Sequence, residues 1–210
     1  MTNPATHLVY LPAAGAGNVT WGKPDLQMHW GANVSCHLWP SETQVWYNLD
    51  IRQQIMAYID GLATSQGTDE TSTSASAPER IILVGFSKSG LGALNLAPML
   101  KDRLAGVVIF DTPTSMALRA GWGIEPFYPD DEHWQADLPA NRIKTYASVF
   151  GEDCPLVLIT GSAFHEQMST FSDNLNQAGV THQYIHRPAM KHNWQTGWLE
   201  LAQAALALPS

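Results

Sequence analysis

Short apolar runs recur along the chain and alternate with segments whose apolar residues have helical spacing. Continuous Val, Ile and Leu runs are typical of strands buried on both faces of a parallel sheet. Polar residues alternate in the last run, which favours a place near the sheet edge. The predicted strands are His7 to Leu11, Asn33 to Leu38, Arg80 to Gly85, Gly106 to Phe110, Leu156 to Thr160 and His182 to His186.

Helical patterns lie between these runs. The first helix has Asn48 or Asp50 as a candidate cap. Pro98 should kink or shorten the second helix, and Gly179 should end the third. The apolar stripes are Ile51, Ile55, Ile59 and Leu62, then Leu91, Leu94 and Leu100, then Met168, Phe171 and Leu175, then Trp194, Trp198, Leu199 and Ala202.

Strand and helix alternate, which predicts βαβ units. The expected fold is a three-layer α/β fold, with a mostly parallel sheet of about six strands and helices on both faces. A chain of 210 residues is long enough for one domain with a real core, so a single domain over residues 1–210 is expected.

Two segments interrupt the alternation. Residues 64–79 are rich in Ser, Thr and Ala and are expected to be a flexible surface insertion, because they lack apolar side chains to pack. Residues 112–150 are long for a connection, and loops of that length are often lids or binding loops. The alternative is that their rings pack beneath a long loop. These rings belong to Trp122, Phe127, Tyr128, Trp134 and Tyr146.

Composition narrows the classes of partner. The formal net charge is −8 and the 11 basic residues are scattered, which disfavours nucleic acid. No apolar run approaches the ~20 residues that span a bilayer, and residues 1–6 lack a signal-peptide pattern. We therefore expect a cytoplasmic protein without a membrane partner. Cys36 and Cys154 are expected to be buried free thiols. No oligomeric state is indicated.

The segment Gly85-Phe86-Ser87-Lys88-Ser89 contains the strongest chemical signal, because a buried strand leads through a tight turn into a helix. It resembles the nucleophile elbow of α/β-hydrolases, G-x-S-x-G, with Ser87 at the apex. That turn needs small residues two positions from the serine. Gly85 satisfies this need, and Ser89 replaces the usual second glycine. The alternative is an ordinary turn with a capping serine.

A serine becomes a nucleophile when a base takes its proton. The resemblance implies the chain order serine, acid, histidine, with the histidine after the last strand. His192 lies in that loop. His186 is the main alternative, although a position within the strand would direct it into the sheet layers; His165 and His182 are weaker candidates.

The acid has two candidates. In most α/β-hydrolases it follows the next-to-last strand, where this chain has Phe164 at the expected position and Glu166 close by. Asp111 stands directly at the carboxyl end of the preceding buried strand, where some lipases of similar fold have their acid. We favour Asp111 and keep Glu166 as the alternative.

An oxyanion hole needs backbone N–H groups directed at the developing charge. The resemblance implies that Lys88, after the nucleophile, supplies one group. The small-residue loop Leu11 to Gly17 supplies the other, from Ala13 or Ala14. Gly15-Ala16-Gly17 within this loop is too short for the G-x-G-x-x-G nucleotide pattern, and no P-loop run follows. His182 and His186 are four residues apart, but they lie on a predicted strand and have no cysteine or carboxylate partner at metal-ligand spacing.

The chain resembles small esterase- and lipase-like serine hydrolases, and the resemblance extends from about His7 to Leu206. It implies cleavage of a small-molecule carboxylic ester through a Ser-His-Asp triad and an acyl-enzyme, without cofactor or metal. The alternatives are a thioesterase or amidase of the same fold, and a catalytically silent α/β-hydrolase that acts as a binding module.

Overall fold

Six strands form one parallel sheet in the order β2-β1-β3-β4-β5-β6. The computed structural model describes residues 5–14, 30–31, 33–41, 43, 45–65, 79–118, 121–193 and 197–206. The six predicted strands are confirmed with small changes at their ends, and β6 lies at an edge as expected. The strands are β1 Thr6–Leu11, β2 Val34–Leu38, β3 Arg80–Phe86, β4 Leu104–Phe110, β5 Leu156–Thr160 and β6 Gln183–His186.

The central strands are apolar on both faces because helices cover both faces. Leu83 and Val107 point into one hydrophobic cluster, and their chain neighbours Val84 and Val108 point into the other. All four side chains are fully buried. This two-sided burial explains why the strands appear in the sequence as unbroken apolar runs.

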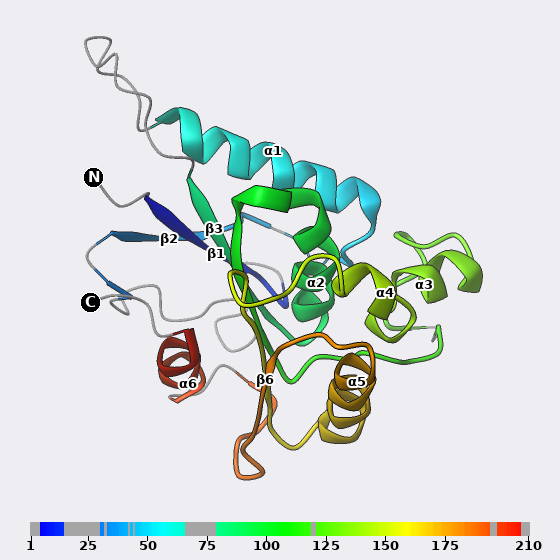
Figure 1. The fold of residues 1–210 in the computed structure, drawn as a ribbon. Coiled ribbons are helices and arrows are strands. Elements are labelled where there is room, and N and C mark those ends of the chain that lie inside the picture. Colours follow the sequence, from blue (N-terminus) through cyan, green and yellow to red (C-terminus); the bar gives the residue numbers. More distant parts are fainter. Residues whose placement is uncertain are drawn as a thin grey trace, which may run out of the picture.

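The helices complete a three-layer arrangement. Apolar residues of α1 Leu49–Ser65, α2 Lys88–Leu100 and α5 His165–Gln177 join the cluster on one face. Those of α6 Trp198–Leu206 join the cluster on the other face. Figure 1 shows α5 and α6 on opposite sides of β6. Shorter helices are α3 Asp131–Asp137, α4 Ile143–Tyr146, and the 3-10 turns Lys101–Arg103 and Pro139–Asn141.

Helix ends follow the local signals. The side chain of Asn48 accepts a hydrogen bond from the Ile51 N–H at 3.0 Å, so Asn48 caps α1. Gly179, with φ of +74°, follows α5 as predicted. Pro98 lies inside α2, which ends two residues later at Leu100.

Residues 112–150, described except for 119–120, are packed onto the body of the protein. Trp134 is fully buried, and its ring meets the Trp46 ring edge-on at 5.2 Å. Asp137 binds Arg52 at 3.0 Å and Arg142 at 3.3 Å and accepts a hydrogen bond from the Tyr128 hydroxyl. Most of the aromatic rings of this segment therefore pack inward.

Several remaining expectations concern the surface. Residues 66–78 of the predicted insertion lie outside the described part of the chain. Cys36 and Cys154 are free, as expected, but only partly buried.

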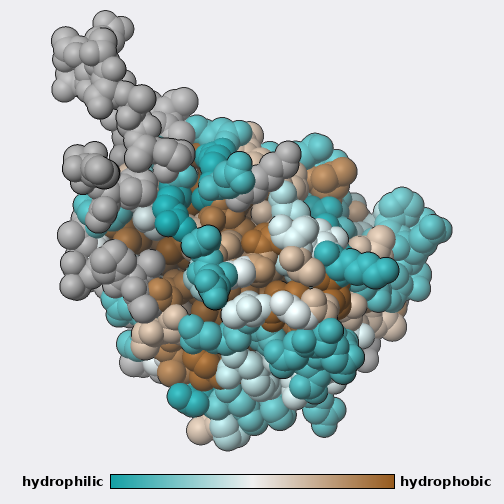
Figure 2. Space-filling model, in the orientation of Figure 1, coloured by the Kyte–Doolittle hydropathy of each residue, from teal (hydrophilic) through white to brown (hydrophobic). Residues whose placement is uncertain are grey.

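None of the helices that the structure describes has both the length and the apolar character that a membrane span requires. In the view of Figure 2, hydrophobic residues gather in the middle of the visible face and hydrophilic residues cover the outer surfaces of α3 and α5.

Gly90 is required by the close approach of α2 to the turn after β4. A Cβ atom at Gly90 would lie 1.9 Å from the Thr112 hydroxyl oxygen, whereas a Cβ at Gly61 in α1 would meet nothing within 4 Å. We expect Gly90→Ala to lower the free energy of unfolding by about 1–3 kcal/mol through overpacking. The matched control Gly61→Ala should raise it by about 0.5–1 kcal/mol, because alanine favours helix. Urea denaturation measures both; equal effects would contradict this packing.

Candidate active site

The candidate residues meet at the carboxyl ends of β1, β3 and β4. The strand order reverses at β1, because β2 lies on one side of it and β3 on the other. In open α/β sheets, crevices for ligands form at such a reversal, outside the carboxyl ends of the strands. Ala13 follows β1 and Ser87 follows β3, so both lie at this reversal.

Ser87 occupies a sharp turn between β3 and α2. Its φ is +55°, a left-handed conformation that is costly for a residue with a side chain. Hydrogen bonds hold the turn on both sides: the Ser87 N–H donates to the Phe110 carbonyl at 2.9 Å, and the Gly90 N–H donates to the Ser87 carbonyl at 3.0 Å. Gly85 is needed, since a Cβ there would lie 2.4 Å from the Ser89 carbonyl oxygen.

Ser89 contributes more than small size to this turn. Its hydroxyl accepts a hydrogen bond from the Phe86 N–H and donates one to the Phe86 carbonyl, both at 2.8 Å. Ser89 is fully buried, so its hydroxyl satisfies two backbone groups that water does not reach. The departure from the usual glycine therefore adds hydrogen bonds to the turn.

His192 stands between Ser87 and Asp111. Its Nε2 is 3.0 Å from Ser87 Oγ, and its Nδ1 is 2.7 Å from Asp111 Oδ2. An ionised carboxylate only accepts hydrogen bonds, so Nδ1 is the protonated nitrogen of the neutral ring. Nε2 is then the acceptor for the Ser87 hydroxyl, which is the arrangement that general-base activation requires.

Two aromatic rings and an anchored loop fix His192 in place. Its ring centroid lies 4.7 Å from that of Phe86 and 5.2 Å from that of Phe164. The loop that carries it is tied down because the Met190 carbonyl accepts a hydrogen bond from the Ser162 N–H at 3.1 Å. A Cβ at Gly161 would lie 2.3 Å from the same carbonyl, so Gly161 permits this docking.

Asp111 is fully buried with φ of +43°. Its second oxygen, Oδ1, accepts hydrogen bonds from the Thr160 hydroxyl, the Gly161 N–H and the Phe164 N–H at 3.1–3.2 Å. Burial pushes its pKa upward, but the hydrogen bonds and the imidazole of His192 outweigh burial, and the pKa lies below its usual value. Asp111 is therefore ionised at neutral pH.

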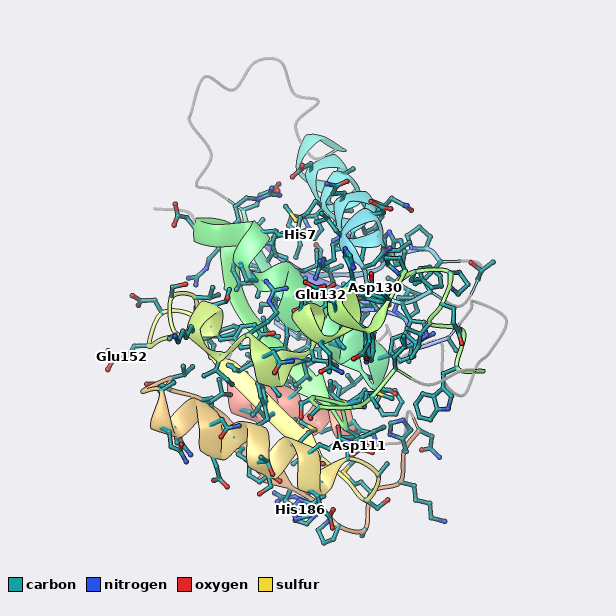
Figure 3. The ribbon with its side chains drawn as sticks, turned by 90° about the vertical axis from the view of Figure 1, so that its right-hand side faces the viewer. His7, Asp111, Asp130, Glu132, Glu152 and His186 are labelled. Carbon is teal, nitrogen blue, oxygen red and sulfur yellow. The ribbon has the colours of Figure 1, made fainter. Side chains whose placement is uncertain are left out.

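Phe164 stands where the acid was expected from the usual pattern. Its backbone N–H binds Asp111 and its ring contacts His192, so the position supports the acid that follows β4. Glu166, the alternative acid, is exposed in the first turn of α5. The geometry places Asp111, and not Glu166, against His192. Figure 3 shows Asp111 apart from Asp130, which caps α3, and from Glu132 in its first turn.

The other candidate histidines have partners elsewhere. The His186 ring stacks on that of His165 at 3.6 Å, and Figure 3 shows His186 apart from Asp111. His182 Nε2 lies 2.7 Å from the Ser172 hydroxyl. Within the described ranges, no three His, Cys, Asp or Glu side chains form a group that could hold a metal ion.

A cavity of about 300 Å³ opens beside Ser87. Three aromatic residues line it, and Trp122, 42% exposed, is the one contributed by the aromatic stretch of residues 112–150. This volume suits a small ligand. The lining residues are Ala13, Trp46, Ser87, Lys88, Pro113, Gly121, Trp122 and Phe164.

Two backbone N–H groups are candidates for an oxyanion hole. Lys88 is the first residue of α2, and N–H groups in a first helical turn have no partner within the helix. Ala13 lines the cavity and Ala14 is not among its described lining residues, which favours Ala13. Residues 15–17 of the same loop lie outside the described residues.

Tyr47, which the sequence analysis did not single out, orients the Ala13 N–H. Its buried hydroxyl donates to the Pro12 carbonyl at 2.5 Å. In a trans peptide the carbonyl and the following N–H point in opposite directions, and no described peptide bond is cis. The Ala13 N–H therefore points away from Tyr47. No local pattern marks Tyr47, because its contact depends on how two distant segments pack.

The fold is similar to those of several known proteins, although the sequence is not. No protein-family model matches the chain, and no curated protein matches it in sequence. SOBER1 of Arabidopsis thaliana is similar in structure, with a TM-score of 0.58, 16% identity, and coverage of 97% of this chain and 98% of that chain. The capsule O-acetyltransferase of Neisseria meningitidis serogroup A has a TM-score of 0.67 and 14% identity, and the match covers 99% of this chain and 89% of that chain. Est2, an esterase of Thermogutta terrifontis, has a TM-score of 0.54 and 12% identity, and the match covers 97% of this chain and 81% of that chain.

These similarities extend over nearly the whole chain, so the protein has the α/β-hydrolase fold that its sequence predicted. The solved structures that match nearly the whole of this chain include several esterases. At such low identity the likeness concerns the fold, and the chemistry has to be argued from the site itself.

Proposed function

We propose that this protein is a serine hydrolase that cleaves small carboxylic esters through an acyl-enzyme. The observation that carries the proposal is the continuous hydrogen-bonded series from Ser87 through His192 to the buried Asp111. Esterases and an acetyltransferase share this fold, and both kinds of enzyme transfer acyl groups. A small-molecule substrate fits the cavity beside Ser87.

The proposed reaction assigns a task to each group of the site. Ser87 Oγ attacks the ester carbonyl while His192 Nε2 takes its proton, and His192 later returns that proton to the departing alcohol. Asp111 holds the ring and stabilises the imidazolium. The N–H groups of Lys88 and Ala13 bind the oxyanion of the tetrahedral intermediate. Water activated by His192 then releases the acid, and no cofactor takes part.

Ser87→Ala tests the nucleophile. We expect hydrolysis of 4-nitrophenyl acetate and butyrate to fall by about a thousandfold or more, because the covalent step is lost. Ser148→Ala, which removes an exposed serine hydroxyl that donates to the Thr145 carbonyl within its own turn, is the control and should retain the rate.

A fluorophosphonate probe separates the alternatives. Labelling of Ser87 without ester hydrolysis would favour a thioesterase or amidase. A folded wild-type protein that neither hydrolyses esters nor takes the probe at Ser87 would overturn the proposal and favour a silent binding module.

Asp111→Asn tests the acid. We expect kcat/KM to fall by about 10³–10⁴-fold, because an amide at this position favours the wrong tautomer of His192. Asparagine tolerates the left-handed backbone found here, which makes it a conservative substitution for folding. Glu166→Gln should keep wild-type kinetics, and a larger loss in Glu166→Gln than in Asp111→Asn would contradict the assignment.

Tyr47→Phe tests a positioning residue. Without the hydroxyl, the peptide between Pro12 and Ala13 loses its fixed orientation, and we expect kcat to fall by about tenfold with little change in KM, since the oxyanion forms only in the transition state. Tyr58→Phe removes a tyrosine hydroxyl that donates a longer hydrogen bond, of 3.4 Å, to the Leu38 carbonyl away from the site, and it is the control. Equal effects of the two substitutions, or an effect on KM alone, would contradict this role.

A further inference from the structure

Lys88 has a side chain that the proposed mechanism does not use. The residue is 5% exposed, and among the described residues its ammonium nitrogen, Nζ, has no hydrogen-bond partner. Nζ lies over the Trp46 ring, 5.4 Å from its centroid, in a cation–π contact. Both residues line the cavity beside Ser87.

A buried, unpaired lysine is expensive for a folded protein. Burial disfavours its charged form and lowers the pKa of Lys88 to about 7. Methionine would fill a similar volume without this cost. No described ion pair or hydrogen bond offsets the cost, so the fold does not explain the ammonium group.

The surroundings of Lys88 fit a ligand that carries a negative charge. Among the described residues that line the cavity, Lys88 has the one charged side chain, and three of the other lining residues are aromatic. A lysine ammonium is a compact charge on a flexible stem with three donors, so it can turn from Trp46 toward a ligand. Because this ammonium is buried, a pair between it and a carboxylate is stronger than it would be in water.

We propose that Lys88 selects esters that carry a carboxylate group in addition to the ester bond, with the carboxylate bound by its ammonium beside Ser87. This inference rests on the proposed function and names its substrate class. The backbone N–H of Lys88 stays available for the oxyanion. One residue then joins substrate recognition to the reacting carbonyl.

Matched substrate pairs test the selection. Mono-4-nitrophenyl adipate and 4-nitrophenyl hexanoate have acyl chains of equal carbon number and differ in a terminal carboxylate. 4-Acetoxybenzoate and its methyl ester place the charge on the alcohol side. After subtraction of the uncatalysed rates, we expect wild-type kcat/KM to favour the anionic member of at least one pair by about tenfold or more.

Lys88→Met keeps the backbone N–H and removes the charge. We expect the ratio of anionic to neutral kcat/KM to fall by about tenfold or more, and Lys88→Arg to retain part of the preference. A thermal melt of each variant confirms folding. Using a ratio within each variant removes any common effect on the oxyanion hole.

The ratio should also depend on pH. Lys88 is cationic below its pKa of about 7, so the preference for the anion should be present at pH 6 and decline by pH 8. The carboxylates of the probes are ionised throughout this range. His192 and Asp111, the titratable groups next to Ser87, act on both members of a pair and cancel in the ratio.

The outcomes separate the two proposals. Hydrolysis of neutral and anionic esters without a preference that depends on Lys88 would overturn this inference and leave the proposed function intact. Absence of hydrolysis and of fluorophosphonate labelling would overturn the proposed function. In that case adipate decides the anion site alone: it should raise the melting temperature of the wild type and not of Lys88→Met, and no shift in either would overturn the site.

Discussion

The buried carboxylate of Asp111 is the group on which the site's geometry depends. One oxygen binds His192, and the other binds the Thr160 hydroxyl and the N–H groups of Gly161 and Phe164. A single ion thereby joins the ends of β4 and β5, the start of α5 and the loop after β6. A buried carboxylate without hydrogen-bond partners would greatly destabilise the folded protein. With four partners, Asp111 stays ionised and fixes the tautomer of His192.

Backbone strain at the strand ends belongs to the same construction. Ser87 and Asp111 both have positive φ, at the ends of neighbouring strands. The Ser87 N–H donates to the Phe110 carbonyl and the Asp111 N–H to the Ile159 carbonyl, so each strained residue is held by the next strand of the sheet. Such conformations persist only where the surroundings determine them. Here the parallel register of β3, β4 and β5 supplies that determination.

The sequence predicted the fold well because its signals are local. The run from Leu156 to Thr160, for example, is buried along its whole length. In a chain where strand and helix patterns alternate, such a run is typical of a strand buried on both faces. Ser87 and His192 were predicted from motif and order, and in the structure their side chains lie 3.0 Å apart. The acid was harder, because the position of Asp111 at the end of a buried strand favoured it over Glu166, but only the distance to His192 distinguishes the two directly. Tyr47 and the ammonium of Lys88 gave no signal, since hydrogen-bond partners and burial arise only from packing between distant segments.

The supports of the catalytic centre and of the cavity wall are largely separate. Asp111 and the turns after β4 and β5 hold His192. The ion cluster of Asp137 instead fixes α3, whose Trp134 packs edge-on against Trp46, and Trp46 in turn donates a hydrogen bond to the Trp122 carbonyl. Trp46 is also the ring beneath the Lys88 ammonium. Changes in residues 121–150 can therefore reshape what the cavity accepts without moving the groups that would perform the chemistry, which is how one fold comes to serve many substrates.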